Sequence, residues 1–207
     1  GPDGGGVVRA PRAVAALAAL LLLNGCQSTL DAAKKLPEPS PAVADLVDYR
    51  QGLALLREGR VDEALQQLGS ARAAYPRSAE VANALGLAYL YRKDHRNATK
   101  LFAEALALDE NLVEAKNNRG VAAMEAGRLE DAEKDFDEVL SGSRTSEHLK
   151  ARFNLGLLRA RQLRWADAER ELTTVLADDP GYLNAARERG LARMKLEDFR
   201  GALEDFL

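Results

Sequence analysis

The stretch EVANALGLAYLYRKDHRNATKLFAEALALDEN, residues 80–111, sets the pattern for most of the chain. Gly86 is followed by Ala98 twelve residues later, and Phe102 comes four residues after Ala98. The same series starts from five glycines spaced by 34, 34, 36 and 34 residues: Gly52, Gly86, Gly120, Gly156 and Gly190. The alanines that follow them are Ala64, Ala98, Ala132, Ala168 and Ala202, and the large apolar residues are Leu68, Phe102, Phe136, Leu172 and Phe206. This period predicts a repeated pair of helices.

The residue types in this series have a physical reason. A glycine on the first helix and an alanine on the second let the two backbones approach, and the large residue one turn later fills the space beside the alanine. A glycine inside a helix costs about 1 kcal/mol relative to alanine, so its regular recurrence indicates a packing requirement. Chance helical periodicity in an Ala- and Leu-rich chain would not keep three residue classes in register five times.

Residues 45–207 resemble the tetratricopeptide repeat family. Leu85-Gly86, Tyr89 and Ala98 match the family pattern, as do Phe102 and Ala105, and a proline stands near the end of two repeats, at Pro76 and Pro180. The resemblance implies an all-α, right-handed superhelical solenoid of helical hairpins. We expect about 4.5 repeats, at 45–78, 79–112, 113–148, 149–182 and a partial repeat at 183–207.

The chain departs from the family pattern at several places. Glu110 and Arg144 stand where the family has proline, and the aromatic residue usual near the start of each repeat is replaced by Asp48, Ala82, Lys116 and Arg152. The third repeat has two extra residues, which we expect in the polar loop 141–146. The chain starts at Gly1 and stops within a repeat, so we interpret the sequence as a fragment. Leu203, Phe206 and Leu207 should then be poorly covered.

Residues 1–25 have the pattern of an export signal. Arg9 and Arg12 precede an apolar run, AVAALAALLLL, at 13–23, which is shorter than the roughly 20 residues that span a bilayer. The sequence Leu-Asn-Gly-Cys at 23–26 resembles a bacterial lipobox. That resemblance implies diacylglycerol on the sulfur of Cys26, cleavage before it, and acylation of the new amine. The alternative is an ordinary signal helix with an accidental cysteine.

Residues 26–44 are interpreted as a lipidated cysteine and a flexible tether. Pro37, Pro39 and Pro41 favour an extended polyproline II conformation, which would hold the repeats away from the membrane. The alternative is a Pro-rich peptide ligand. In lipoproteins, aspartate after the cysteine tends to retain the protein in the inner membrane. Gln27 therefore favours the periplasmic face of the outer membrane.

The composition argues against several classes of function. The net charge is −3 without a basic block, so nucleic-acid binding is not expected. One cysteine and two histidines cannot form an internal disulfide or a Cys/His metal site. The sequence lacks a Gly-rich phosphate loop, a paired-carboxylate motif and an HExxH motif, so we expect no enzymatic activity, cofactor or small-molecule substrate. We expect His95 half-buried at a hairpin turn, His148 in a loop or at a helix start, and Trp165 in the core.

The resemblance also implies an inner groove lined by the first helix of each repeat. The positions that line the groove in the family correspond in this sequence to Tyr49, Leu53, Arg57, Asn83, Leu87, Tyr91, Asn117, Val121, Met124, Phe153, Leu157, Arg161 and Arg187. Such a mixture suits an extended or helical peptide, with asparagine amides pairing to its backbone. The alternative for each residue is an ordinary packed or solvated helix position. The Lys/Asn clamp of some family members is not present, since Tyr49 and Leu53 occupy its first positions.

A lipobox followed by an array of such repeats resembles the pilotin lipoproteins of type IV pilus biogenesis, which help an outer-membrane secretin to assemble. The expected function is therefore a lipid-anchored periplasmic scaffold that binds another protein. An adaptor for cell-wall hydrolases and a tight-adherence pilus lipoprotein are the alternatives within the binding class. An enzyme with a cryptic site in the groove is the alternative outside it.

Overall fold

The computed structural model describes residues 46–142 and 145–207, so the predicted signal, Cys26 and the tether lie outside the described residues. Within them the chain is all α-helical, as predicted. The first helices of the hairpins, called A helices here, are α4 (Val47–Arg57), α6 (Ala79–Tyr91), α8 (Val113–Glu125), α10 (Ser146–Arg161) and α12 (Leu183–Lys195). Their partners, the B helices, are α5 (Val61–Ala74), α7 (His95–Leu108), α9 (Leu129–Ser141), α11 (Trp165–Asp178) and α13 (Phe199–Phe206).

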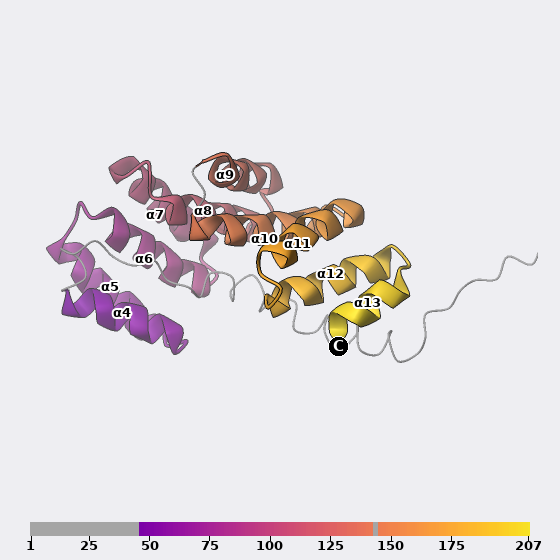
Figure 1. Ribbon diagram of the computed structural model, residues 1–207. Helices are drawn as coiled ribbons and strands as arrows, with labels where there is room; N and C mark the ends of the chain where they lie inside the picture. The colour runs from indigo at the N-terminus through magenta and orange to yellow at the C-terminus, as the bar shows by residue number, and fades with distance from the viewer. Residues whose placement is uncertain (1–45, 143–144) are drawn as a thin grey trace, which may run out of the picture.

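The hairpins are stacked in the order of the sequence. Each A helix packs on its own B helix, each A helix after α4 also packs on the B helix that precedes it, and successive A helices touch. Figure 1 shows the helix pairs following one another from the indigo end to the yellow C-terminal end. Because each repeat packs chiefly on its neighbours, the stability of the array is approximately a sum of repeat and interface terms.

The recurring glycines are where the A and B helices approach most closely. A methyl group added to Gly86 would lie 2.6 Å from Cε1 of Phe102, and one added to Gly120 would lie 2.6 Å from Cε1 of Phe136. The large apolar residue of the B helix therefore occupies the space that a Cβ would fill. This contact confirms the packing requirement predicted from the repeat period.

The turn between the A and B helices has one geometry throughout. Its central residue has a positive φ in every hairpin, at Gly59, Lys93, Gly127, Leu163 and Glu197, with φ between 60° and 77°. Only glycine adopts this left-handed conformation without steric cost. Three of the five turns thus hold an unfavourable backbone conformation, which the packing of the flanking helices stabilises.

The B helices end at equivalent places with or without the family proline. Helix α5 ends two residues before Pro76 and α11 two residues before Pro180, while α7 ends at Leu108 although Glu110 replaces the proline. After α7 the side chain of Asp109 accepts a hydrogen bond from the backbone N–H of Asn111, at 2.9 Å. The same turn follows α11, where the N–H of Gly181 donates to Oδ1 of Asp179 at 3.0 Å across Pro180, so this aspartate turn ends the helix with or without the proline.

Part of the insertion in the third repeat is helical. Helix α10 begins at Ser146 and is 16 residues long, against 13 for α6, α8 and α12. Thr145 caps it, because its Oγ1 accepts from the N–H of Glu147 and its own N–H donates to Nδ1 of His148 at 3.0 Å. His148 is therefore a helix-start residue, and the expectation that all of 141–146 forms a loop is wrong at Ser141, which ends α9, and at Ser146, which begins α10.

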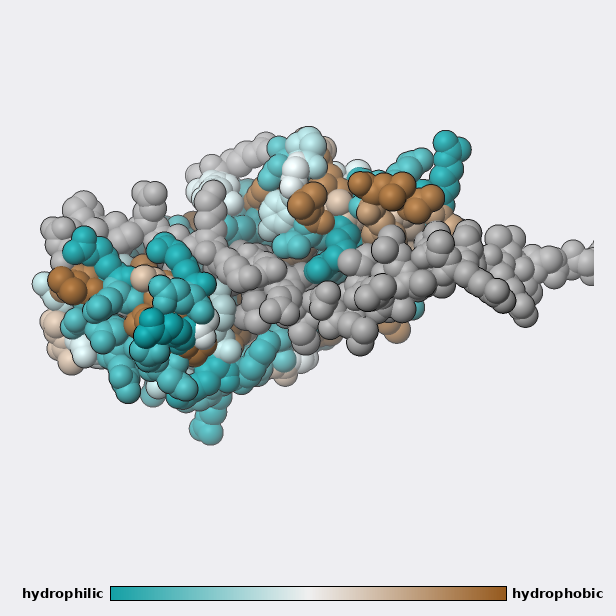
Figure 2. Space-filling view, turned by 90° about the horizontal axis from the view of Figure 1, so that it is seen from below, coloured by the Kyte–Doolittle hydropathy of each residue, from teal (hydrophilic) through white to brown (hydrophobic). Residues whose placement is uncertain are grey.

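The last hairpin leaves apolar side chains exposed. Leu203 and Leu207 are 41% and 96% exposed, and Phe206 is half-buried whereas its equivalents in the other hairpins are fully buried. In a view from below, hydrophilic residues cover most of the coloured surface, and brown hydrophobic patches lie both at the N-terminal end on the left and on the right, toward the C-terminal helices (Figure 2). No helix in the described part of the chain has the length and hydrophobicity that crossing a membrane requires.

Candidate functional site

The predicted groove residues form a row along the A helices, called the A-helix row here. Its buried members are Tyr49, Leu53, Asn83, Leu87, Asn117, Val121, Met124, Phe153 and Leu157. Tyr91 and Arg187 are half-buried, and Arg57 and Arg161 are exposed. The structure therefore presents four of these side chains at the surface, and partner contact by any of them stays a prediction.

Buried asparagines link the A helices of successive repeats. Nδ2 of Asn118 on α8 donates to Oδ1 of Asn83 on α6 at 3.0 Å, and Nδ2 of Asn154 on α10 donates to Oδ1 of Asn117 on α8 at 3.0 Å. Nδ2 of Asn117 also lies 3.4 Å from a carboxylate oxygen of Glu147. The amides thus hold neighbouring repeats in register. Asn118 and Asn154 were not predicted as row members, although their spacing of 36 residues equals that of the glycines beside them.

Several polar atoms on the A helices lack a hydrogen-bond partner within the described residues. They are Oη of Tyr49, Nδ2 of Asn83 and Oδ1 of Asn154, and all three side chains are fully buried. A buried polar atom without a partner costs roughly 1–3 kcal/mol, so most such atoms in folded proteins are paired. Because all three side chains are fully buried, a partner at the surface does not reach these atoms in this arrangement.

Three tyrosines in or near the row, Tyr49, Tyr91 and Tyr182, have raised pKa values and are neutral at physiological pH. Burial raises the pKa of Tyr49, with smaller contributions from the negative charges of Glu80 and Glu114, and burial also raises the pKa of Tyr91. Burial, together with Asp179 and Glu147, raises the pKa of Tyr182 to about 12. The Tyr182 ring lies 5.1 Å from that of Phe153, which ties the fourth and fifth A helices together.

Arg161 contacts the end of the preceding A helix. Its Nη1 donates to the backbone oxygen of Met124 at 2.9 Å, and its Nη2 lies 2.5 Å from the carboxylate of Glu125. The exposed guanidinium therefore spans from α10 to the end of α8. A partner carboxylate at this point would have to share Arg161 with Glu125.

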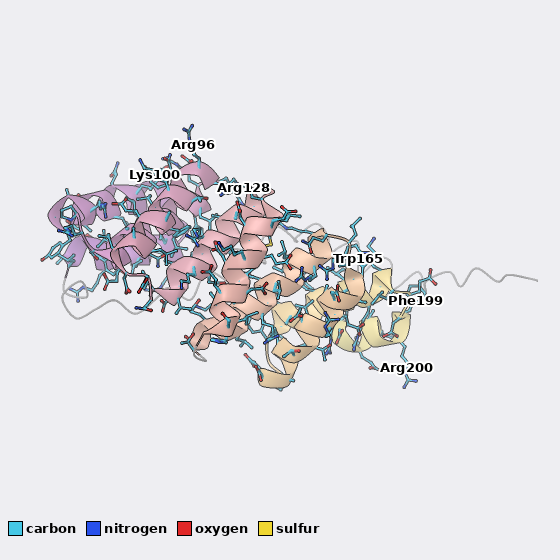
Figure 3. The ribbon with its side chains drawn as sticks, turned by 90° about the horizontal axis from the view of Figure 1, so that it is seen from above. Arg96, Lys100, Arg128, Trp165, Phe199 and Arg200 are labelled. Carbon is cyan, nitrogen blue, oxygen red and sulfur yellow. The ribbon has the colours of Figure 1, made fainter. Side chains whose placement is uncertain are left out.

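A basic edge lies at the start of α7 and α9. Arg96, Lys100 and Arg128 project from this edge in Figure 3. Arg128 donates to Oγ1 of Thr99 at 2.9 Å and lies 3.3 Å from Asp131. Below it is a polar cavity of about 330 Å³, in which Arg119 and Asp135 form a two-point ion pair. Among the described residues, Arg128 is thus the one member of this edge with a carboxylate within ion-pair distance, and Arg96 and Lys100 have none.

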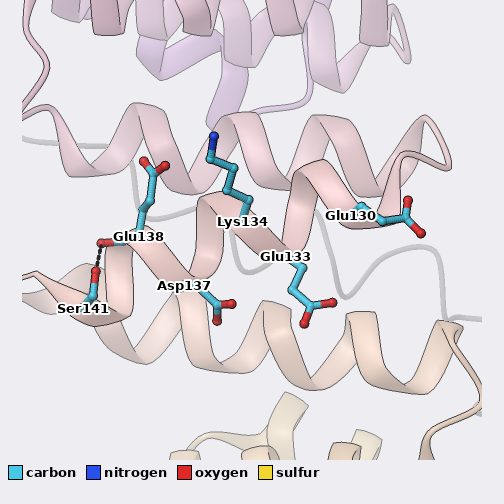
Figure 4. Close-up of a pocket in the computed structure, with 6 residues that line it drawn as sticks. All are labelled: Glu130, Glu133, Lys134, Asp137, Glu138 and Ser141. Atoms are coloured by element: carbon cyan, nitrogen blue, oxygen red, sulfur yellow. Dashed lines mark hydrogen bonds between the residues drawn. The ribbon is translucent and has the colours of Figure 1, made fainter.

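Helix α9 presents an acidic surface with an open hollow of about 610 Å³, lined by Glu130, Glu133, Lys134, Asp137, Glu138 and Ser141 (Figure 4). The hydrogen bond from Arg159 lowers the pKa of Glu133. Partial desolvation, with the charges of Glu133 and Glu171, raises the pKa of Asp137 against the effect of Arg159. Among the described residues, no group of three or more His, Cys, Asp or Glu side chains could hold a metal ion.

A smaller and more apolar cavity lies between α10, α11 and α12. Its volume is about 220 Å³, and its lining is Ala160, Trp165, Glu188, Leu191, Ala192, Met194 and Lys195. Trp165 is half-buried and forms part of the wall, whereas the sequence predicted it in the core. His95 takes its predicted place, half-buried as the first residue of α7. The cavity could not be found from the sequence, because three helices contribute to it and each residue alone has an ordinary packing role.

The chain matches a known repeat family and is similar in fold to several solved structures. The tetratricopeptide repeat model matches residues 49–113, 83–147 and 153–207. The structure of PilF from Pseudomonas aeruginosa is similar, with 23% identity, a TM-score of 0.69, and coverage of 76% of this chain and 71% of PilF. MamA from Desulfovibrio magneticus RS-1 is 20% identical, with a TM-score of 0.62 and coverage of 76% and 89%. YrrB, described as having an unusual peptide-binding site, is 18% identical, with a TM-score of 0.55 and coverage of 78% and 82%.

At these identities the structural likeness shows the fold alone. No curated protein sequence matches the chain significantly. The evidence for function therefore comes from the repeats and from the surfaces that they present.

Proposed function

The chain belongs to the tetratricopeptide repeat family of protein-interaction scaffolds, and we propose that it is a lipid-anchored periplasmic scaffold that holds a partner protein along its A-helix row. The family is typically non-enzymatic, and we assign no catalytic role to any residue. The acyl chains on Cys26 would anchor the protein to the outer membrane, since each buried methylene contributes about 0.8 kcal/mol to membrane binding. The tether of residues 27–44 would then separate the repeats from the lipid surface.

The observation that carries the binding proposal is the set of row members at the surface, which are Arg57, Tyr91, Arg161 and Arg187. They lie on A helices of the first, second, fourth and fifth repeats, so a single extended segment following the row could meet all four. Tyrosine and arginine are among the side chains most enriched at binding hot spots, and acidic groups of such a segment would pair with the arginines.

The proposed partner is an outer-membrane secretin of a type IV pilus system. Two observations support this choice: the lipobox-like sequence ending at Cys26, and the similarity of the repeat array to PilF. In this role the anchor would bring the bound secretin subunit to the outer membrane, where the secretin assembles. The anchor and the array would then act together, the first supplying location and the second supplying recognition.

The test is to delete the gene and measure secretin multimers in outer-membrane fractions. We expect the multimers to be lost and to return with the wild-type chain. Cys26→Ser should remove palmitate labelling and leave the array folded, because the tether separates the anchor from the core. This variant should not restore the multimers. A chimera should restore them, in which the signal and lipobox cysteine of a different lipoprotein are placed before the Cys26→Ser tether and array.

Two results would count against the proposal. Palmitate labelling and outer-membrane fractionation of Cys26→Ser would exclude Cys26 as the lipid anchor. Normal secretin multimers in the deletion strain would exclude the pilotin role, and a cell-wall separation defect in the same strain would point to a hydrolase adaptor instead.

A further inference from the structure

The cavity beside Trp165 has the features of a pocket for one side chain. It lies where α10 ends, α11 begins and the second half of α12 passes, and Figure 3 shows Trp165 at the start of its helix. Its volume of about 220 Å³ is below the roughly 300–1,000 Å³ of pockets for drug-sized ligands. It is also several times the roughly 30 Å³ that one water molecule occupies in the liquid. A single aromatic or branched aliphatic side chain is the group of matching size.

The lining of this cavity is mostly apolar and includes an adaptable residue. Trp165 and Leu191 supply apolar surface, Ala160 and Ala192 leave room, and Met194 can change rotamer to fit the inserted group. Binding pockets at protein interfaces commonly hold one such buried side chain, surrounded by contacts of lower energy. The lining therefore suits an apolar side chain presented by a protein segment.

The charge at the rim of the cavity is positive. Helix α12 has four cationic residues, and Arg187, Arg189 and Arg193 each pair with a carboxylate at 3.0 Å or less. Lys195 has no carboxylate within ion-pair distance among the described residues, and its Nζ lies 5.9 Å from the centre of the Trp165 ring. Glu188, the acidic residue of the lining, pairs with Arg187 at 2.8 Å. The rim thus keeps one uncompensated cation, Lys195.

We propose that this cavity binds one aromatic or aliphatic side chain from an acidic segment of a partner protein, and that a carboxylate next to that side chain pairs with Lys195. The inference rests on the proposed scaffold function but adds a specific contact outside the A-helix row predicted from the sequence. The apolar lining selects the side chain that enters, and Lys195 selects the charge of the segment around it. A partner with a basic segment at this point would be repelled by Lys195 and bind more weakly.

Trp165 is the only tryptophan in the chain, so its fluorescence reports on this cavity directly. The experiment titrates the purified full chain, in detergent micelles, with a short peptide that has one phenylalanine flanked by glutamates. Matched peptides replace the phenylalanine by alanine or the glutamates by lysines. We expect a saturable change in fluorescence with the first peptide, with Kd weakened about tenfold or more by loss of the phenylalanine. The lysine peptide should also bind more weakly than the glutamate peptide, and this difference in Kd should shrink at high salt.

Two variants and one control substitution test the assignment to this cavity. Ala160→Leu fills the space and should abolish the response, whereas Ala103→Leu, an exposed alanine on α7, should not change it. Lys195→Gln should remove the preference for glutamate over lysine peptides while leaving the preference for phenylalanine over alanine. Circular dichroism melting of each variant separates loss of binding from loss of fold.

Equal binding of the glutamate and lysine peptides, or of the phenylalanine and alanine peptides, would overturn the inference. A response that survives in a folded Ala160→Leu variant would overturn it as well. If the peptide titration fails but the wild-type chain restores secretin multimers in the deletion strain, only the proposed pocket is rejected. If the multimers are normal without the gene, the proposed function itself is rejected.

Discussion

At the scale of single residues, the fold depends on glycines whose missing Cβ atoms admit a large side chain from the partner helix. The repeat period alone predicted this contact, because register along a helix fixes which residues meet. The period did not predict which A-helix side chains are covered. Phe153 and Tyr49 belong to the same row as Arg161, yet both are fully buried and Arg161 is exposed. Burial depends on neighbouring repeats, and the pattern within one repeat does not contain that information.

The burial of Phe153 changes how the row should be tested. Truncating a fully buried phenylalanine to alanine lowers the free energy of unfolding by about 3–5 kcal/mol. Phe153→Ala would therefore unfold part of the array, and its effect on binding could not be separated from that loss of structure. The half-buried Tyr91 and the exposed Arg161 are better probes, because their replacement leaves the packing between helices largely in place. Sequence reasoning treated Tyr91 and Phe153 as equivalent, and the structure separates them.

Replacing single glycines by alanine tests the packing account. Gly86→Ala should lower the free energy of unfolding by about 1 kcal/mol or more, since overpacking costs about 1–3 kcal/mol and outweighs the gain in helix propensity. Gly69→Ala is the matched control, because no atom lies within 4 Å of an added Cβ there and the residue is exposed within α5. It should raise the free energy of unfolding by about 0.5–1 kcal/mol. Urea denaturation measures both, and equal effects of the two substitutions would contradict the account.

At the scale of helices and turns, the sequence predicted where the hairpins bend but not the backbone conformation of the bend. Gly59 and Gly127 mark the turn in two repeats, while Lys93, Leu163 and Glu197 hold the same left-handed conformation without glycine. A search for glycine alone would therefore miss three of the five turns. The helix packing on both sides imposes the turn, and local residue preference is secondary.

The turn residue Leu163 offers a direct test of this ranking. Its φ is 60° and its side chain is 70% exposed, so Leu163→Gly relieves backbone strain with little loss of packing. We expect the free energy of unfolding to rise by about 0.5–1 kcal/mol, because the left-handed conformation costs a non-glycine residue about 1–2 kcal/mol and part of the gain is lost to the flexible unfolded chain. Gly127→Leu should have the opposite effect, of similar size. Thermal melting of both variants decides the point, and a destabilising Leu163→Gly would show that its side chain packs against the array.

At the scale of the whole molecule, stacked repeats turn a local pattern into a long surface. The Asn83–Asn118 and Asn117–Asn154 hydrogen bonds link successive A helices, so side chains at equivalent positions align across repeats. The resemblance to the repeat family implied the positions of the row, and binding along it stays a prediction. The sequence did not reveal the cavity beside Trp165, since that space exists only where the ends of α10, α11 and α12 come together.

The central claim is that the A-helix side of the array holds a protein partner. The most direct measurement is photo-crosslinking in living cells, with a photoreactive amino acid placed in the full chain at Tyr91 or Arg161 on A helices, and at Gln66 or Lys134 on exposed faces of B helices. We predict that the A-helix positions crosslink to one outer-membrane protein, the secretin, and that the B-helix positions do not. Crosslinks to the same protein only from Gln66 and Lys134, with the A-helix positions silent in a folded chain, would contradict the claim.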